Sequence, residues 1–275
     1  MNWLCFTPNV RKLAVMKLQM PLLVFTDLDG TLLSHATYQS DAASPALKRL
    51  ENIGAGVVMA SSKTASEIYV LREDLRLQQW PAIVENGAGL LKPYAKGAMD
   101  YSFYAQLRAK LNKISADLRV LFRGFGDMDV TQVADRTGLS LSAAALAKER
   151  AFSEPGIWLG APEEKAAFLE ALKAQGIFAR QGGRFLTLSF GTTKADQITQ
   201  ITKDFAPRHT IALGDAPNDI EMLEAADFGV IIANPHCAPL PELSGEKSGR
   251  IIRTTQSGPV AWNAAILAHL KRLNL

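Results

Sequence analysis

Two carboxylates follow directly after an apolar stretch near the N-terminus. Residues 22–25 read Leu-Leu-Val-Phe, and residues 26–31 continue as Thr-Asp-Leu-Asp-Gly-Thr. A continuous apolar run is typical of a buried parallel strand, and ligands of open α/β sheets collect beyond the carboxyl ends of such strands. Asp27 and Asp29 are two residues apart, so an extended chain would point both side chains to one side. Such a pair suits Mg²⁺, and an aspartate there could attack a phosphoryl group.

An acidic turn after a core strand would also explain this motif, because Asp and Gly are ordinary turn residues. Three later polar groups favour a catalytic site over a simple turn, because each follows its own strand-like run. They are Ser61 after residues 56–60, Lys194 after residues 180–191, and Asp215 after residues 210–213, the last within the sequence Gly-Asp-Ala-Pro-Asn-Asp. Four strand-like runs are thus each followed by a group suited to phosphoryl transfer.

The composition limits the class of protein. A length of 275 residues predicts about two domains, with enough core to fold without disulfides. The net charge of +3 comes from dispersed Lys and Arg, with no basic run that interleaves aromatic residues, so a nucleic-acid partner is not indicated. A modest positive charge suits a small anionic substrate.

Cysteine and histidine are sparse, which argues against a disulfide scaffold or a zinc site. Cys5 and Cys237 lie far apart, and the four histidines are scattered. Basic residues interrupt the short apolar stretches of residues 1–20, so neither a cleavable signal nor a membrane span is expected there. We interpret residues 1–20 as an N-terminal extension and expect a cytoplasmic protein with no membrane partner.

The order of strand and helix signals predicts an α/β fold with a doubly wound, mostly parallel sheet. Ser44 and Pro45 open one helix, and Thr64 with Glu67 forms a capping box that opens another. The segment 89–187 changes character. It contains helix patterns at residues 104–120, 142–150 and 162–175, and a Gly-rich turn at residues 124–127. We therefore expect an inserted domain over residues 89–187, and a core domain formed by residues 21–88 and 188–275.

The ordered motifs resemble the haloacid dehalogenase superfamily of phosphatases, whose pattern is DxDGT, a Ser or Thr, a Lys, and GDxxND. The resemblance implies a Rossmann-like core with an α+β type 2 cap inserted between the second and third motifs. It also implies a Mg²⁺-dependent phosphatase that forms an aspartyl-phosphate. A cap would close over the substrate and shield the intermediate from stray water.

The resemblance also assigns roles to the core residues. Asp27 is the nucleophile, Asp29 the general acid and base, and Ser61 and Lys194 the partners of the phosphoryl oxygens. Thr31 helps to orient the loop, and Asn218 either orients the loop after the fourth motif or touches the phosphate. The metal ligands it implies are Asp27, Asp29, Asp215 and Asp219. Helix capping is the alternative role for Ser61, Asp215 and Asp219, and a solvated surface position is the alternative for Lys194.

The segment 89–187 resembles a narrower family, mannosyl-3-phosphoglycerate phosphatase. The resemblance rests on Gly124-Phe-Gly-Asp-Met128, Thr137-Gly-Leu139, Ala147-Lys-Glu-Arg150, Ser153-Glu-Pro155 and Gly182-Gly-Arg-Phe185, with Ser61-Ser-Lys-Thr64 and Glu85-Asn-Gly87 in the core. It implies hydrolysis of mannosyl-3-phosphoglycerate to mannosylglycerate, a compatible solute.

Such a substrate carries a carboxylate, for which arginine is the natural bidentate partner. Arg150 and Arg184 are therefore candidates for the glycerate, and Glu154 for sugar hydroxyls, while Lys63 and Asn86 could reach in from the core. Alternatives are a broader sugar-phosphate phosphatase, a mutase of the phosphomannomutase type and a silent binding module. The choice between mannosyl and glucosyl substrates stays open, as does that between a monomer and a small homo-oligomer.

Overall fold

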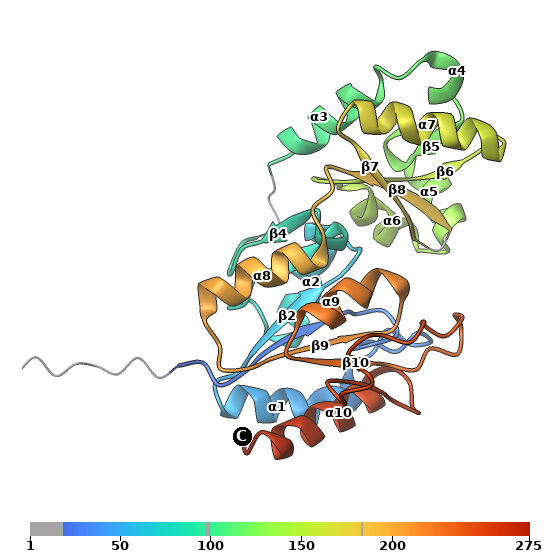
Figure 1. The fold of residues 1–275 in the computed structure, drawn as a ribbon. Coiled ribbons are helices and arrows are strands. Elements are labelled where there is room, and N and C mark those ends of the chain that lie inside the picture. Colours follow the sequence, from blue (N-terminus) through green and yellow to red (C-terminus); the bar gives the residue numbers. More distant parts are fainter. Residues whose placement is uncertain (1–18, 97–99, 183) are drawn as a thin grey trace, which may run out of the picture.

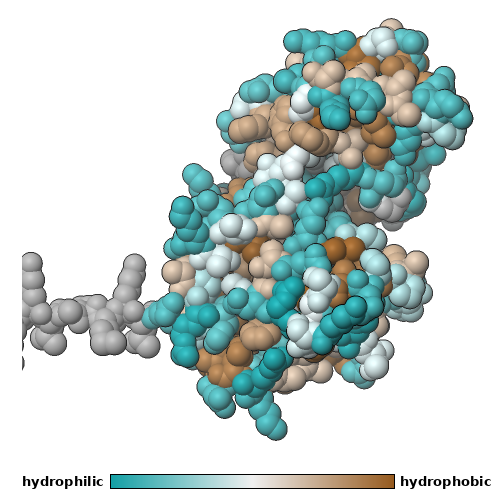
Figure 2. Space-filling model, viewed as in Figure 1, coloured by the Kyte–Doolittle hydropathy of each residue, from teal (hydrophilic) through white to brown (hydrophobic). Residues whose placement is uncertain are grey.

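A computed structural model of the chain describes residues 19–96, 100–182 and 184–275. The chain forms two lobes, each built on its own β-sheet (Figure 1). Most of the expected N-terminal extension, residues 1–18, lies outside the described residues, as does Gly183. Figure 2 shows hydrophilic and hydrophobic side chains interspersed over the viewed face of both lobes. Among the described helices, none combines the length and apolar character that crossing a membrane requires.

The large lobe contains a seven-stranded sheet in the order β11-β10-β9-β1-β2-β3-β4. Its strands are β1 (Leu23–Thr26), β2 (Gly56–Ala60), β3 (Ala82–Val84), β4 (Gly89–Leu91), β9 (Thr210–Gly214), β10 (Phe228–Ile231) and β11 (Ile251–Arg253). All neighbouring strands are parallel except β4, which runs antiparallel to β3. Strand β1 thus lies at the centre of the sheet, between β2 and β9.

Helices cover both faces of this sheet, as the alternation of strands and helices predicted. The helices of this lobe are α1 (Ser44–Asn52), α2 (Ala65–Leu75), α8 (Lys194–Phe205), α9 (Ile220–Ala225) and α10 (Gly258–Arg272). Leu22 and Val24 face α1, α2 and α10, while Leu23 and Phe25 face α8 and α9. Successive strand residues point to opposite faces, so the all-apolar run 22–25 serves two hydrophobic cores at once.

The small lobe contains a four-stranded antiparallel sheet in the order β5-β6-β8-β7. Its strands are β5 (Phe122–Gly124), β6 (Glu154–Trp158), β7 (Phe178–Gly182) and β8 (Phe185–Ser189), and its helices are α3 (Ser102–Leu111), α4 (Ala116–Arg119), α5 (Val130–Thr137), α6 (Leu141–Lys148) and α7 (Pro162–Ala174). Helices α3 and α7 share a core with one face of the sheet, and α5 and α6 pack near the other. Short 3₁₀ turns occur at Asp41–Ala43, Glu85–Gly87, Phe125–Asp127 and Pro217–Asp219.

The structure departs from the sequence-based expectations at three places. The helix expected over residues 104–120 is wrong in its middle, because α3 ends at Leu111 and α4 begins at Ala116. Ser115 adopts extended angles before α4, and Ile114 turns into the core of the small lobe. Strand β4 lies in the segment assigned to the inserted domain but pairs within the large sheet, and β8 spans the expected bound at residue 187 and continues to Ser189.

Buried hydrogen bonds connect the central strand to the C-terminal helix. Trp262 Nε1 donates to Thr26 Oγ1 over 3.0 Å, and this hydroxyl donates to the carbonyl of Asp27 over 2.7 Å. Thr26 is fully buried and is the last residue of β1. The chain therefore leaves the sheet at Asp27 with its direction fixed by α10.

Thr26→Val tests this connection. The valine has a similar shape but leaves the indole N–H of Trp262 and the carbonyl of Asp27 without this partner. We expect the free energy of unfolding in urea to fall by about 1 to 3 kcal/mol. Thr199→Val is the control, because the exposed Thr199 hydroxyl bonds only within α8, to the carbonyl of Ala195; its effect should stay within about 0.5 kcal/mol. Equal losses in the two variants would contradict the prediction.

Candidate active site

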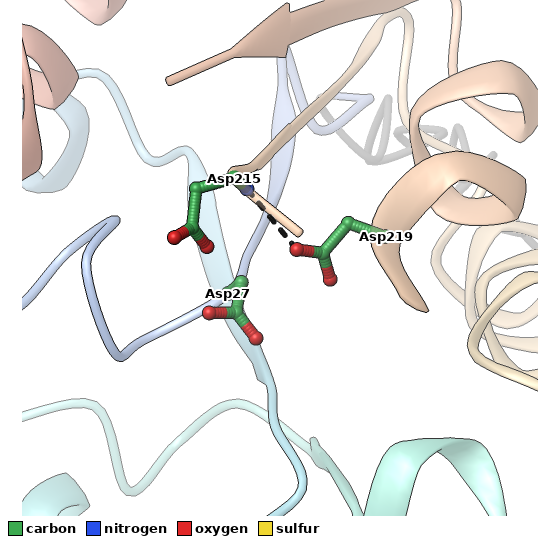
Figure 3. A group of neighbouring side chains, drawn as sticks. All are labelled: Asp27, Asp215 and Asp219. Atoms are coloured by element: carbon green, nitrogen blue, oxygen red, sulfur yellow. Dashed lines mark hydrogen bonds between the residues drawn. The ribbon is translucent and has the colours of Figure 1, made fainter. Parts of the chain in front are cut away.

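Three carboxylates converge at the carboxyl ends of two adjacent strands. Asp27 follows β1, Asp215 follows β9, and Asp219 ends the 3₁₀ turn that comes next (Figure 3). One oxygen from each lies within 4.8 Å of the others, and all three residues are buried. Because β1 and β9 pair in parallel, Thr26 opposite Leu213, the residues beyond both strands emerge at the same edge.

Lys194 lies between two of these carboxylates. Its Nζ is 2.9 Å from Asp27 Oδ1 and 2.7 Å from Asp219 Oδ1, and the residue is almost fully buried. Thr193 caps helix α8 at this point and accepts the backbone N–H of Asp196, so Lys194 starts the helix directly beside the acidic group. Burial lowers the pKa of Lys194, but Asp219 and Asp27 more than offset it, and the pKa lies above its ordinary value.

Hydrogen bonds fix the two C-terminal aspartates. Asp215 accepts from Thr31 Oγ1 at 3.2 Å and from Asn234 Nδ2 at 2.6 Å. Asp219 Oδ2 accepts the backbone N–H groups of Asp215 and Ala216, while its Oδ1 faces Lys194. Asp219 therefore does both things that the sequence allowed, capping the turn and joining the site. Sequence reasoning missed Asn234; a polar residue just after the apolar run 228–232 was its signal.

Asp29 lies apart from this acidic cluster. Its Oδ2 is 2.9 Å from Lys63 Nζ, and its buried Oδ1 has no hydrogen-bond partner. Its carboxylate, expected among the metal ligands, is not brought together with Asp27, Asp215 and Asp219, because the regular alternation of side chains ends with β1 at Thr26. Beyond it the chain turns, with Gly30 at φ +85°. A Cβ at Gly30 would lie 2.7 Å from Asp215 Oδ2, so this turn has no room for a larger residue.

Lys63 thus has a carboxylate partner within the protein. Its Nζ also lies 5.4 Å from the ring centre of Tyr38. Burial lowers the pKa of Lys63, but the charge and hydrogen bond of Asp29 more than offset it, so the pKa lies above its ordinary value. Lys63 is therefore protonated and paired with Asp29 in the structure.

Ser61, Asn86 and Asn218 line the neighbouring strand ends. Ser61 follows β2, is 1% exposed, and its Oγ accepts the N–H of Lys63 at 3.3 Å. Asn218 Nδ2 donates to Asn86 Oδ1 over 3.2 Å, which joins the loop after β9 to the loop after β3. The structure thus places these polar groups on loops that border the acidic cluster.

The candidates of the small lobe separate into buried and exposed groups. Arg150 is buried and donates to the carbonyl of Ser62 and to Ser153 Oγ, so its guanidinium already has partners. Glu154 is fully buried, with partners in the Tyr104 hydroxyl, the N–H of Gly126 and Arg108. Arg184 is exposed and donates to the carbonyl of Thr137. Arg150 and Glu154 thus each have partners within the protein, whereas the guanidinium of Arg184 lies at the surface.

Residues 24–120 and 160–238 match the haloacid dehalogenase-like hydrolase family, which is more than half of the chain. The chain belongs to this family. The fold is also similar to solved structures. The sucrose-phosphatase of Synechocystis sp. PCC6803, solved with sucrose and phosphate, has 16% identity and a TM-score of 0.60, over 93% of this chain and 99% of that one. BT1666 from Bacteroides thetaiotaomicron, described among the phosphatases of the haloalkanoate enzyme superfamily, has 20% identity and a TM-score of 0.60, over 96% of this chain and 98% of that one. The subclass IIB sugar phosphatase BT4131 has 18% identity and a TM-score of 0.58, over 92% and 98%.

Phosphatases of this family generally use a divalent metal ion, and the donor set here fits one. Burial raises the pKa of Asp27 well above its usual range, with Asp219 and Asp215 adding to it and Lys194 opposing it. Burial and the charge of Asp219 raise the pKa of Asp215 to about 6. One ammonium faces three carboxylates, so a divalent cation held by Asp27, Asp215 and Asp219 would balance the remaining charge.

The pKa of Asp215 predicts how stability depends on pH when chelator removes divalent ions. A raised carboxyl pKa stabilises the folded state below the ordinary value of 3.8, and this contribution is lost as the pH rises through about 6. From pH 4 to pH 7 in EDTA, we expect the unfolding free energy of the wild type, relative to Asp215→Asn, to fall by about 2 to 3 kcal/mol.

Urea unfolding at each pH measures this difference, and saturating Mg²⁺ is the matched condition. A cation at the site stabilises the charged carboxylates, so Mg²⁺ should abolish the fall in the wild type. The same pH dependence in both proteins, with or without Mg²⁺, would refute the assignment.

Proposed function

We propose that this protein is a Mg²⁺-dependent phosphomonoesterase that works through an aspartyl-phosphate on Asp27. The observation that carries the proposal is the contact of buried Lys194 with both Asp27 and Asp219, next to Asp215. A lysine that only stabilised the fold would not need three converging carboxylates at the edge of a parallel sheet. The arrangement suits a nucleophile, a charge-neutralising group and a cation site in one place.

The proposed chemistry has two steps. In the first, a carboxylate oxygen of Asp27 bonds to phosphorus while the bond from phosphorus to the leaving alkoxide breaks, and Asp29 gives the alkoxide its proton. In the second, Asp29 takes a proton from water, the water oxygen bonds to phosphorus, and the bond to Asp27 breaks, releasing inorganic phosphate. Asp29 enters the first step protonated and is protonated again after the second. It lies outside the cluster of Asp27, Asp215 and Asp219, which leaves it available to carry a proton between the leaving group and water.

The remaining groups hold the phosphoryl oxygens. Lys194 orients Asp27 and neutralises negative charge, and Ser61 offers its hydroxyl from the end of β2. Mg²⁺, held by Asp27, Asp215 and Asp219, would supply electrostatic stabilisation of the transferring group. In this proposal the small lobe is the cap, and Arg180 of β7 forms an ion pair with Glu221 of α9, bringing the two lobes together.

We propose mannosyl-3-phosphoglycerate, or a related glycosyl phosphoglycerate, as the substrate. Most of the motifs that support this lie in the small lobe, around the turn after β5, the connection from α5 to α6, the connection from α6 to β6, and the β7–β8 turn. Two more, residues 61–64 and 85–87, lie in the large lobe. Arg184 at the β7–β8 turn is exposed and available to a carboxylate. A broader sugar-phosphate phosphatase is the second candidate, favoured by the similarity of the fold to a sucrose-phosphatase.

Asp27→Asn tests the proposed mechanism. The amide is nearly isosteric but cannot attack phosphorus, so release of phosphate should be abolished while circular dichroism stays that of the wild type. Brief incubation of the wild type with substrate, acid quenching and mass spectrometry should place the phosphate on Asp27. Stoichiometric phosphate release without a sugar bisphosphate separates a phosphatase from a mutase. Full turnover by Asp27→Asn, or phosphate on another residue, would reject the mechanism.

Arg184→Ala tests the proposed substrate. Removing a charged partner of the glycerate carboxylate should lower kcat/KM for mannosyl-3-phosphoglycerate by more than about tenfold, and leave p-nitrophenyl phosphate almost unaffected. Arg150→Ala is the contrasting variant, because its partners are internal and both substrates should suffer. Equal losses in Arg184→Ala would mean a structural role for that residue, and no loss would place the glycerate elsewhere. A panel of glycosyl 3-phosphoglycerates then distinguishes mannosyl from glucosyl preference.

A further inference from the structure

The turn Glu85–Gly87 has an uncommon backbone at the junction of the two lobes. It follows β3 and precedes β4, and its residues have φ values of 52°, 59° and 95°. The left-handed region costs energy for residues other than glycine, and two such residues in succession need contacts that hold them there. Those contacts reach three separate parts of the molecule.

The first contacts are with the loop that carries Ser61. The N–H of Glu85 donates to the carbonyl of Lys63 over 2.9 Å, and the N–H of Asn86 donates to the carbonyl of Ser61 over 2.8 Å. Two backbone hydrogen bonds therefore fix both ends of the segment 61–63. The position of the Ser61 hydroxyl depends on the position of this turn.

The second contacts are with the start of α8. A Cβ placed on Gly87 would lie 2.1 Å from the carbonyl carbon of Thr193 and 2.2 Å from the nitrogen of Lys194, so the two backbones touch directly. The carbonyl of Gly87 also accepts Gln197 Nε2 at 3.1 Å. The turn thus packs against the residue whose side chain bridges the acidic cluster.

The third contacts reach the small lobe through the Glu85 side chain, which is fully buried. Its carboxylate accepts the N–H groups of Ala151 (2.8 Å), Phe152 (3.2 Å) and Ser153 (2.7 Å), and the Ser153 hydroxyl (2.7 Å). Arg150 Nε lies 3.3 Å away. One side chain of the large lobe therefore holds the whole segment that leads into β6, through charge-assisted hydrogen bonds.

We propose that Glu85 is a positioning residue that couples the small lobe to the phosphate-binding groups. Its carboxylate holds residues 150–153, while the backbone of its turn holds Ser61 and packs against Lys194. Movement of the small lobe relative to this carboxylate is therefore transmitted to both groups. The inference rests on the proposed function, in which Ser61 and Lys194 contact the transferring phosphoryl group.

Glu85→Gln tests the coupling, because glutamine keeps the shape but turns one acceptor oxygen into a donor that faces other donors. We expect kcat for p-nitrophenyl phosphate, which is too small to need contacts from the cap, to fall about tenfold to a hundredfold. KM should change by less than about threefold, because the loss concerns the positions of reacting groups. The assay is run well below the thermal midpoint of the variant.

Hydrogen exchange of the substrate-free protein gives a second readout that is independent of catalysis. Exchange should become faster in Glu85→Gln both at residues 61–64 and at residues 150–153.

Ser153→Ala removes one hydrogen bond to the same carboxylate. It should shift both kcat and the exchange rates in the same direction by less, which keeps the test open if Glu85→Gln fails to fold. Glu246→Gln is the matched control, because Glu246 also binds a backbone N–H, that of Leu243, and an arginine, Arg253. It should leave kcat and both segments unchanged.

The proposal is overturned if folded Glu85→Gln keeps the wild-type kcat. It is also overturned if exchange rises at residues 150–153 alone, since Glu85 would then be only a tether for the small lobe. Failure of the proposed function has a different signature. Turnover that persists in Asp27→Asn would reject the phosphatase mechanism, while the exchange measurement would still decide whether the two segments are coupled.

Discussion

Mutual repulsion among Asp27, Asp215 and Asp219 is the constraint on which the rest of the structure depends. Two unit charges 4.8 Å apart repel by about 3 kcal/mol at an effective dielectric constant of about 20. Lys194 offsets part of this repulsion through its contacts with Asp27 and Asp219. Burial raises the pKa values of Asp27 and Asp215, and the neighbouring carboxylates raise them further. The unbalanced charge is what a divalent cation would stabilise, so the strain of the acidic cluster and its capacity to bind metal have the same origin.

The carboxylates of such a cluster stay close together only if the backbone that carries them is rigid. Strand β1 supplies this rigidity, because it lies between β2 and β9 and has apolar contacts on both faces. The hydrogen bonds of the Thr26 hydroxyl with the indole of Trp262 and the carbonyl of Asp27 hold the chain at the point where it leaves the sheet. Asp219 is held by hydrogen bonds within a short turn, and Asp215 by Thr31 and Asn234 from two other loops. Lys194 is held by the first turn of a helix. Different local devices thus hold each group, and the parallel sheet brings them to one edge.

The contrast between local devices and the alignment of strand ends by the sheet explains which parts of the site could be predicted from sequence. Asp27, Asp215 and Lys194 each come directly after a local signal, and parallel strands align their ends without further information. The two-residue spacing from Asp27 did not predict where the Asp29 carboxylate lies, because the alternation of side chains within a strand says nothing about the turn after it. Tertiary partners decide such positions.

The small lobe shows the same limit. Arginine in a segment with family motifs could bind a substrate or another part of the protein. Only the fold reveals that Arg150 contacts Ser62 and Glu85. The error in the helix expected over residues 104–120 has a related cause. The helical pattern of the sequence continues through residues 112–115, but in the structure Ile114 packs into the core of the small lobe and the helix is interrupted there. The sheets, the order of motifs and the acidic cluster were within reach of the sequence, while the pairing between lobes was not.

The contacts between the lobes are strongly asymmetric. Around Glu85 they are buried and numerous, and Thr64 adds a hydrogen bond to the carbonyl of Leu146 nearby. The ion pair of Arg180 with Glu221 has side chains about half exposed. Exposed ion pairs contribute about 0 to 1 kcal/mol, whereas a buried carboxylate that loses its donors costs several times more. A motion that separates the lobes therefore breaks the exposed pair first and turns about the Glu85 contacts. Because the turn Glu85–Gly87 touches Ser61 and Lys194, rotation about this pivot acts directly on the phosphate-binding groups.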